Sequence, residues 1–423
     1  MSRCFDSVKS LKLFDPDVLC EALRRFPEDL VRGKVSLPEN PDAENMPYEA
    51  IQRMLIAGDV SDGLTDLLFY VGRLGNAEGW EHIIHEARLL GLRVDERSGN
   101  ISYAGCALRA WLADWPRNRD LLEKSYARTR LYSLTAYHYF PMDRDLREKY
   151  RPPSEEEIKK LEHDLVRHFD GRGHGKWVRV HRYEFEDELW FMIRHSGRYE
   201  YVQTADDKGE EVRKYRPVKF DAVVYDKRHG FLSMNTERRA EQCKYRTVIG
   251  HLLFGEANVF IEDRQCVTLE PLKGESAGIF DCGDMKGIRD VELCEVHFLE
   301  LASPGRTVMW KQDGHDGIAL SRATYVQFED GVRVPYENHV LPPSTGHVMS
   351  AKFRYTLRNS RGRREMLTVH AGNRLRYARD SDAARIGEWL IERGFVRVGM
   401  GRWTLRGTDD AHGPFRGADA PPP

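Results

Sequence analysis

Two aspartates near the middle of the chain could take part in phosphodiester chemistry. Asp221 lies inside the apolar run FDAVVY, and Asp226 follows that run, where a turn is expected. Carboxylates on a strand and its adjoining turn are ligands that Mg²⁺ prefers, and a metal-dependent nuclease would use such a site. No Glu-x-Lys pair follows on the next expected strand, so only part of the usual nuclease pattern is present.

An acidic cluster lies at the edge of an earlier expected strand. Its members are Glu184, Glu186, Asp187 and Glu188. These carboxylates could also serve a metal-dependent nuclease. Charged side chains at a strand edge more commonly keep that edge from pairing with another chain, and we interpret the cluster in this way.

Arg246 and His251 form a second pair suited to phosphate chemistry. They have an Arg-x4-His spacing within ERRAEQCKYRTVIGHLLFG, a segment expected to be helical. The spacing resembles the motif of HEPN-type ribonucleases, in which the Arg and the His cooperate on the scissile phosphate. The resemblance implies ribonuclease activity with these two catalytic residues. HEPN domains are all-helical, whereas this helix follows two expected strands, and the resemblance extends to no other part of the chain.

Other motifs of catalysis are absent or incomplete. His82 and His85 lie three residues apart on an expected helix, but HIIHE is not the metalloprotease pattern, and we interpret the pair as helix surface or core. The chain has no Walker phosphate-binding loop, no dinucleotide-binding glycine motif and no Gly-x-Ser-x-Gly nucleophile motif. The sequence therefore predicts neither a metal site nor a cofactor.

Residues 351–406 are the most chemically biased part of the chain. They contain fourteen Lys and Arg against five Asp and Glu, with aromatic residues between them. Arg binds phosphate in a bidentate manner, so a surface of this kind favours nucleic acid. The candidate contacts are Lys352, Arg354, Arg358, Arg361, Arg363, Arg364, Arg374, Arg376 and Arg379.

The preceding residues 252–350 carry the opposite charge, with sixteen Asp and Glu against eight Lys and Arg. Two neighbouring blocks of opposite sign can pack on one another, or each can bind another protein. A protein partner, including a second copy of this chain, is therefore an alternative to nucleic acid.

The composition of the whole chain limits the class of protein. The 423 residues have a formal net charge of −2, so any polyanion binding must come from local segregation of charge. The seven cysteines form no Cys-x-x-Cys pair, which argues against a zinc ribbon or a disulfide framework. No apolar run has the length of a signal peptide core or a membrane span. These features predict a cytoplasmic, multidomain protein that does not contact a membrane.

Residues 1–150 are expected to form a helical domain, because apolar residues recur every three or four positions. A third consecutive helix ends at Gly91, and the following LRVDERSGNISYAG has the pattern of a β-hairpin. Three helices and a hairpin are the outline of a winged helix, which favours DNA over RNA. The third helix carries Glu81, Glu86 and only Arg88, a poor face for phosphates. The alternative is a helix capped by Gly91 above a small hairpin.

Residues 154–340 are expected to form a central α+β domain. Ser154 and Glu157 make a capping box for its first helix. Alternating residues then predict a mainly antiparallel sheet, and Thr236 is expected to cap a covering helix that ends at Gly255. The expected strands lie within 177–200 and 213–237 and at 267–269, 292–301, 307–310 and 323–328.

The C-terminal part is expected to be a basic module. A linker is predicted at 341–346, and residues 351–406 are expected to form a β-hairpin and a helix capped at Ser381 and Asp382. Residues 407–423, rich in Gly, Ala and Pro, are expected to be disordered. The predicted fold class is therefore α+β and multidomain, with a helical N-terminal domain, a central antiparallel sheet with covering helices, and this basic module.

The sequence predicts a nucleic-acid-binding protein, with DNA preferred to RNA, that has no chemistry of its own and is a subunit of a larger assembly. A nuclease that uses Asp221 and Asp226, or Arg246 and His251, is the first alternative. A scaffold that binds different proteins through its acidic and basic blocks is the second.

Overall fold

The computed structural model describes most of the chain. The described residues are 5–57, 59–94, 101–115, 120–143, 145–206, 209–273, 277–299, 306–311, 322–328, 333–334, 347–358, 364–378 and 383–398. The predicted linker at 341–346 and the predicted disordered tail at 407–423 lie outside these ranges.

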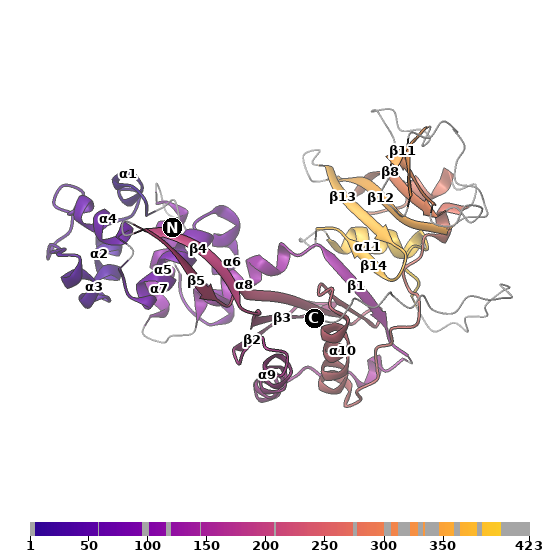
Figure 1. The fold of residues 1–423 in the computed structure, drawn as a ribbon, viewed down its shortest axis with the longest axis horizontal. Helices are drawn as coiled ribbons and strands as arrows, with labels where there is room; N and C mark the ends of the chain where they lie inside the picture. Colours follow the sequence, from indigo (N-terminus) through magenta and orange to yellow (C-terminus); the bar gives the residue numbers. More distant parts are fainter. Residues whose placement is uncertain are drawn as a thin grey trace.

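The described residues form a mixture of helices and strands, as the α+β prediction requires (Figure 1). The α-helices are α1 (Val8–Leu11), α2 (Pro16–Arg24), α3 (Pro27–Arg32), α4 (Tyr48–Ile56), α5 (Asp62–Leu74), α6 (Ala77–Leu89), α7 (Tyr103–Asp114), α8 (Leu121–Tyr132), α9 (Glu155–Asp170), α10 (Arg239–Phe254) and α11 (Ala383–Glu392). Short 3-10 helices are η1 (Arg147–Lys149), η2 (Glu270–Lys273) and η3 (Ala277–Phe280).

The strands are β1 (Ala136–Pro141), β2 (Val178–Glu184), β3 (Glu188–Ser196), β4 (Glu200–Asp206), β5 (Gly209–Tyr215), β6 (Val218–Asp226), β7 (Phe231–Met234), β8 (Ile288–Leu299), β9 (Arg306–Lys311), β10 (Arg322–Phe328), β11 (Arg333–Val334), β12 (His347–Leu357), β13 (Arg364–His370) and β14 (Arg374–Arg376). Twelve of them make one sheet in the order β11-β10-β9-β8-β12-β13-β14-β1-β7-β6-β3-β2, and each recorded neighbour pair is antiparallel.

The two faces of this sheet bury different cores because side chains alternate along each strand. On one face, Phe191, Val223 and Leu232 pack with apolar side chains of α9 and α10. On the other face, Trp190 and Val224 belong to a core that includes residues of α8 and α11. Figure 1 shows α9 and α10 on the same side of the sheet. The sheet therefore separates two apolar cores.

Helices α1 to α7 share a separate apolar core at the N-terminal end of the molecule. Their starts follow local signals: the side chains of Asp15, Ser61 and Asn76 accept hydrogen bonds from backbone N–H groups in the first turns of α2, α5 and α6. Helix α8 links this bundle to the sheet, because Ala127 and Leu131 pack in the sheet core while Leu121 and Leu122 pack in the helical core.

The winged-helix outline is not confirmed. Residues 95–100, at the turn of the expected hairpin, lie outside the described residues. The predicted end of the return strand is wrong, because Tyr103 is the first residue of helix α7 and Ser102 is its N-cap. Glu86 is also not a surface residue of α6: its side chain is buried, and its carboxylate pairs with Arg128 at 2.7 Å. This acidic residue therefore says nothing about a phosphate-binding face.

The basic segment is continuous with the large sheet. Strand β12 pairs with β8 over ten registered positions, and β14 pairs with β1. Phe353 on β12 packs against Trp389 of α11, with ring centroids 5.6 Å apart. The domain boundary placed between residues 340 and 351 stays a prediction. Strand β12, strand β13 and helix α11 share one hydrophobic core with the strands that precede them in the chain.

Three local expectations differ from the structure. The N-cap of α10 is Arg238, not Thr236, because the Thr236 hydroxyl donates to the Glu241 carboxylate at 2.6 Å instead. Val267 makes an isolated bridge to Val396 in place of a strand at 267–269. Strands β4 and β5 form a separate two-stranded ribbon. The sequence did not predict this ribbon, because its residues are mostly polar.

In the described part of the chain, no helix combines the length and the apolar character that a membrane crossing requires.

Candidate functional sites

Asp221 and Asp226 do not form one site. They are five residues apart on β6, and side chains at odd spacing along a strand point to opposite faces. Asp221 faces the core beneath α10, where it is 8% exposed. Asp226 faces the opposite side and accepts from the backbone N–H of His229 at 2.8 Å. The tertiary structure therefore separates the two aspartates that the sequence grouped.

Asp221 belongs to a buried polar cluster. The Tyr245 hydroxyl donates to its Oδ2 at 2.6 Å, and Nε2 of His195 lies 3.2 Å from the same oxygen. Phe169 stacks on the His195 ring with centroids 3.8 Å apart. Burial, followed by the charge of Asp221, raises the pKa of Tyr245 well above its usual value, so this hydroxyl stays protonated as a donor. The arrangement ties α10 and α9 to the sheet.

Arg246 and His251 are also placed apart, although both lie on α10. Arg246 Nη2 pairs with the Glu262 carboxylate at 2.8 Å, and its guanidinium carbon lies 5.1 Å from the Phe140 ring centroid. His251 is exposed in the last turn of the helix. Residues five apart on a helix do not share a face. Across the described ranges, no three His, Cys, Asp or Glu side chains gather closely enough to hold a metal ion.

The basic residues of the C-terminal segment lie partly in ion pairs. Arg354 pairs with Glu292 at 2.5 Å, and Arg374 pairs with Glu237 at 2.7 Å. Arg358 donates from Nε to the Ile288 carbonyl at 3.0 Å. Arg364 is exposed at the start of β13. Of the other predicted contacts, Arg361, Arg363 and Arg379 lie outside the described residues.

Several of these residues line up on the sheet face opposite α11. One cross-strand row runs Ser350–His370–Arg374–His138, and the next runs Lys352–Thr368–Arg376. Strands lie about 4.8 Å apart, so Lys352 and Arg376 are separated by about 10 Å. Burial and the nearby Arg374 guanidinium lower the pKa of both His138 and His370, so both imidazoles are neutral at pH 7.

Further Lys and Arg side chains lie between this face of the sheet and the base of the β4–β5 ribbon, next to the start of α10. Glu237, the partner of Arg374, adjoins Arg238, whose Nη1 lies 3.1 Å from Nε2 of His174. Arg216 donates to the carbonyl of Gly173 at 2.6 Å. The charges of Arg172 and Arg198 act on His174, and that of Lys244 acts on His168. We call the whole group the cationic band: Arg172, Arg198, Lys214, Arg216, Arg238, Lys244, Lys352, Arg374 and Arg376.

Tyr199 places an aromatic ring within the band. The guanidinium carbon of Arg216 lies 3.8 Å from its ring centroid, and Nζ of Lys214 lies 4.0 Å from it. Burial, followed by the charges of His195, Arg238, Arg198 and Arg172, lowers the pKa of His174 to about 4. Three band cations therefore lie close enough to His174 to act on its charge, although burial is the larger cause.

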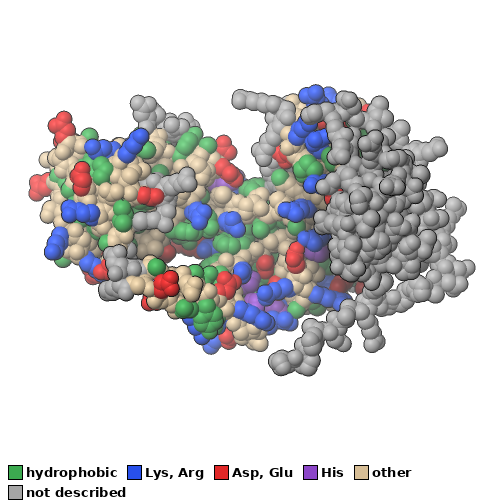
Figure 2. All heavy atoms as spheres, turned by 45° about the horizontal axis from the view of Figure 1, so that its top comes forward, with side chains coloured by type: hydrophobic (Ala, Val, Ile, Leu, Met, Phe, Trp, Pro, Cys, Tyr) green, Lys and Arg blue, Asp and Glu red, His purple; other side chains and the backbone are tan. Residues whose placement is uncertain are grey.

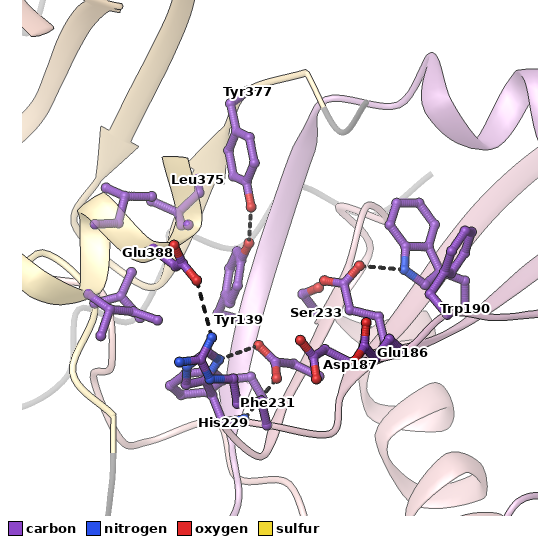
Figure 3. Close-up of a pocket in the computed structure, with 18 of the residues that line it drawn as sticks. Tyr139, Glu186, Asp187, Trp190, His229, Phe231, Ser233, Leu375, Tyr377 and Glu388 are labelled. Atoms are coloured by element: carbon purple, nitrogen blue, oxygen red, sulfur yellow. Dashed lines mark hydrogen bonds and ion pairs between the residues drawn. The ribbon is translucent and has the colours of Figure 1, made fainter. Parts of the chain in front are cut away.

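A cavity of about 320 Å³ lies on the opposite face of the sheet. Figure 2 shows hydrophobic side chains across the floor of the hollow between the helical part and the part that carries β12 and α11. Tyr139 on β1, Trp190 on β3 and Phe231 on β7 line the cavity from the sheet (Figure 3). Tyr132 at the end of α8 and Glu388 on α11 line it from the sides.

The cavity has fixed polar contacts. The hydroxyls of Tyr139 and Tyr377 are 3.1 Å apart, and the Trp190 indole donates to Glu188 at 2.7 Å. Nδ1 of His229 lies 2.8 Å from the Asp226 carboxylate. Arg228 on the β6–β7 turn pairs with Glu388 at 3.2 Å, which joins the sheet to α11.

Sequence reasoning missed this cavity. It placed Glu186, Asp187 and Glu188 at a strand edge, and the structure places all three in the cavity lining. The signal that could have marked them was the segment FEDELW, in which Phe185 and Trp190 flank three consecutive carboxylates. Recognising the cavity also required β14 and α11, which lie far away in the sequence.

Comparison with known proteins gives no relative: no protein-family model matches the chain, and no curated protein sequence matches it.

Proposed function

We propose that the protein binds nucleic acid along the cationic band and contributes no chemistry of its own. The observation that carries this proposal is the succession of contacts from Arg374 through Glu237, Arg238 and His174 to Arg216, which makes cations from distant segments neighbours. A nucleic-acid backbone presents phosphates in succession, and binding is favoured when a row of Lys and Arg releases their counterions.

The chemistry of the band suits an extended strand. Arg contacts phosphate through two parallel N–H groups, and Tyr199 and the neutral imidazoles of His138 and His370 are side chains on which unstacked bases can stack. Ion pairs offset part of the charge, at Arg374 for example, so the band favours a ligand with many phosphates over a single anion. The protein would serve a larger assembly as its nucleic-acid-binding subunit.

The two catalytic alternatives have less support. Asp221 is buried under Tyr245, and Arg246 is held by Glu262, so neither pair faces a common substrate. The preference for DNA rested on the winged-helix pattern, so the experiment below includes both DNA and RNA.

A triple substitution tests the proposal. In Arg198→Gln, Lys352→Gln and Arg376→Gln, three band cations that have no ion-pair partner among the described residues lose their charge. Binding is measured by fluorescence anisotropy with a labelled 30-nucleotide DNA strand, the matching duplex and the matching RNA between 50 and 300 mM salt. We expect weaker binding and a salt slope smaller by about 2, since each lost phosphate contact removes roughly 0.7–0.9 from it.

The matched control removes the same charge from the helical part, as Lys9→Gln, Arg53→Gln and Arg88→Gln. These exposed cations lie on α1, α4 and α6, away from the band. The control should keep the affinity and the slope of the unmodified protein. Equal losses in both triple variants, or no binding by the unmodified protein to any of the three ligands, would overturn the proposal.

The predicted turn at 359–364 is tested separately with Arg361→Ala, Arg363→Ala and Arg364→Ala. Arg364 begins β13, next to the row that holds Arg354. We expect this variant to weaken binding further when it is combined with the band triple, because the turn would contact phosphates beyond the band. Unchanged binding would confine the interface to the band.

A further inference from the structure

We propose that the cavity bounded by β1, β3, β7 and α11 binds an organic ammonium group. The cavity lies on the sheet face opposite the cationic band, so this site is independent of nucleic-acid binding. Its volume of about 320 Å³ is at the lower end of the range for small-molecule sites.

Aromatic rings form two walls of the cavity. On one side, Trp190 has Phe185 edge-on at 5.7 Å and Tyr132 at 5.9 Å between ring centroids. On the other side, Tyr139 and Phe231 lie 6.3 Å apart. Aromatic faces attract cations through the ring quadrupole, and cages of such rings recognise alkylammonium groups.

The charge of the lining favours a cation as well. Among the described lining residues, five are carboxylates and one, Arg228, is a guanidinium. Arg228 is already paired with Glu388. Glu186 and Asp187 are exposed at the rim and have no ion-pair partner among the described residues. In Figure 3 they lie between Trp190 on one side and His229 and Phe231 on the other.

These features exclude the ligand classes that the other face would bind. A phosphate or carboxylate ligand would meet Glu186 and Asp187, whose charges no lysine or arginine among the described lining residues offsets. A neutral apolar ligand would contact the aromatic walls of the cavity but would leave Glu186 and Asp187 without a counterion. An ammonium group with a short aliphatic body satisfies both the rings and the carboxylates.

The probe is choline, compared with 3,3-dimethyl-1-butanol, which has the same shape and no charge. Binding to the full-length protein is measured by isothermal titration calorimetry at 50 mM salt. We expect choline to bind at least tenfold more tightly than the alcohol, the factor that corresponds to a cation–π contact of about 1.4 kcal/mol. Equal dissociation constants for the two probes, or no binding of choline, would overturn the proposal.

Glu186→Gln with Asp187→Asn tests the carboxylates without disturbing the core, because both side chains are exposed. The double variant should bind choline at least tenfold more weakly and leave the weak binding of the alcohol unchanged. The matched control is Glu210→Gln with Glu211→Gln on the exposed β5 strand, which changes the net charge equally and should bind choline normally. Equal weakening in both variants would show that bulk charge, and not the cavity, attracts the ligand.

The ammonium group can come from a small molecule or from a protein side chain. A tripeptide with a central trimethyl-lysine is therefore titrated alongside choline. Tighter binding of the peptide identifies a modified protein as the source, and tighter binding of choline identifies a free metabolite. Either result supports an ammonium site provided that choline itself binds, and no binding of choline contradicts it.

Discussion

At the scale of single residues, burial decides what a titratable side chain can do. Asp221 has the residue type of a metal ligand, yet Tyr245 and His195 surround its carboxylate beneath α10. A buried carboxylate that a hydroxyl and an imidazole both contact stabilises the fold, and its removal leaves the Tyr245 hydroxyl without its acceptor. The structure therefore favours a structural role for Asp221.

Asp221→Ala should lower the free energy of unfolding by about 3 kcal/mol, because it leaves a buried hydroxyl and an imidazole unsatisfied. Tyr245→Phe removes one hydrogen bond and should cost about 1 kcal/mol. Urea unfolding followed by circular dichroism measures both changes. Asp187→Ala, at an exposed carboxylate, is the control and should stay within about 0.5 kcal/mol. An Asp221→Ala protein as stable as the control would contradict the structural role.

At the scale of elements, one buried ion pair fixes the packing of α6 on α8. The Arg128 guanidinium and the Glu86 carboxylate are 2.7 Å apart, and each side chain is 6% exposed. The guanidinium carbon of Arg128 also lies 5.4 Å from the Tyr183 ring centroid, which connects this pair to β2. The helical bundle and the sheet thus share a charged contact.

Glu86→Ala leaves the Arg128 charge buried without a counterion and should destabilise the protein by about 3 kcal/mol. Glu81→Ala on the same helix is exposed and should change stability by less than about 0.5 kcal/mol. Thermal unfolding of the two variants measures the difference. Similar melting temperatures for both would mean that the pair contributes little to the contact between α6 and α8.

At the scale of the whole molecule, several buried histidines link stability to pH. Burial, and then the charge of Arg128, lowers the pKa of His82 to about 4; burial and the charge of Arg194 lower the pKa of His181 to about 3. His174 has a pKa of about 4. Unfolded histidines have pKa values near 6.5, so the unfolded chain takes up protons that the folded chain does not.

Stability should therefore be full above pH 6.5 and should fall as the pH drops from about 6.5 toward 4. Urea midpoints at pH 7.5, 6.5, 5.5 and 5.0 measure this slope. His181→Leu removes one of the three groups and should flatten the slope, whatever its effect on stability at pH 7.5. His251→Gln, at an exposed histidine, should leave the slope unchanged. A midpoint that is constant down to pH 5.0 would contradict the linkage.

The sheet also separates the two surfaces on which the two proposals rest. Alternate residues of β1 and β7 face the cationic band and α10 on one side and the aromatic cavity on the other. Under the two proposals, a polyanion and an organic cation occupy these two faces independently.

Much of the secondary structure could be predicted, because its signals are local. Ser154 and Glu157 form the expected capping box of α9, and Gly255 ends α10 in the left-handed conformation with φ 75°. The apolar period also predicted α6, the helix that was expected to end at Gly91. The sequence did not predict strands β1 and β14. Both are short, and they are stabilised by pairing with each other although they lie more than 200 residues apart in the sequence.

The sequence by itself determined where charge is dense, since the Arg residues of 351–406 are neighbours along the chain. Only the tertiary structure decided which of them are offset, because Glu292 and Glu237 reach Arg354 and Arg374 from other elements. The cavity depends on tertiary structure even more strongly. Its lining extends from Tyr132 to Val396, and residues so far apart become neighbours only through long-range strand pairing and helix packing.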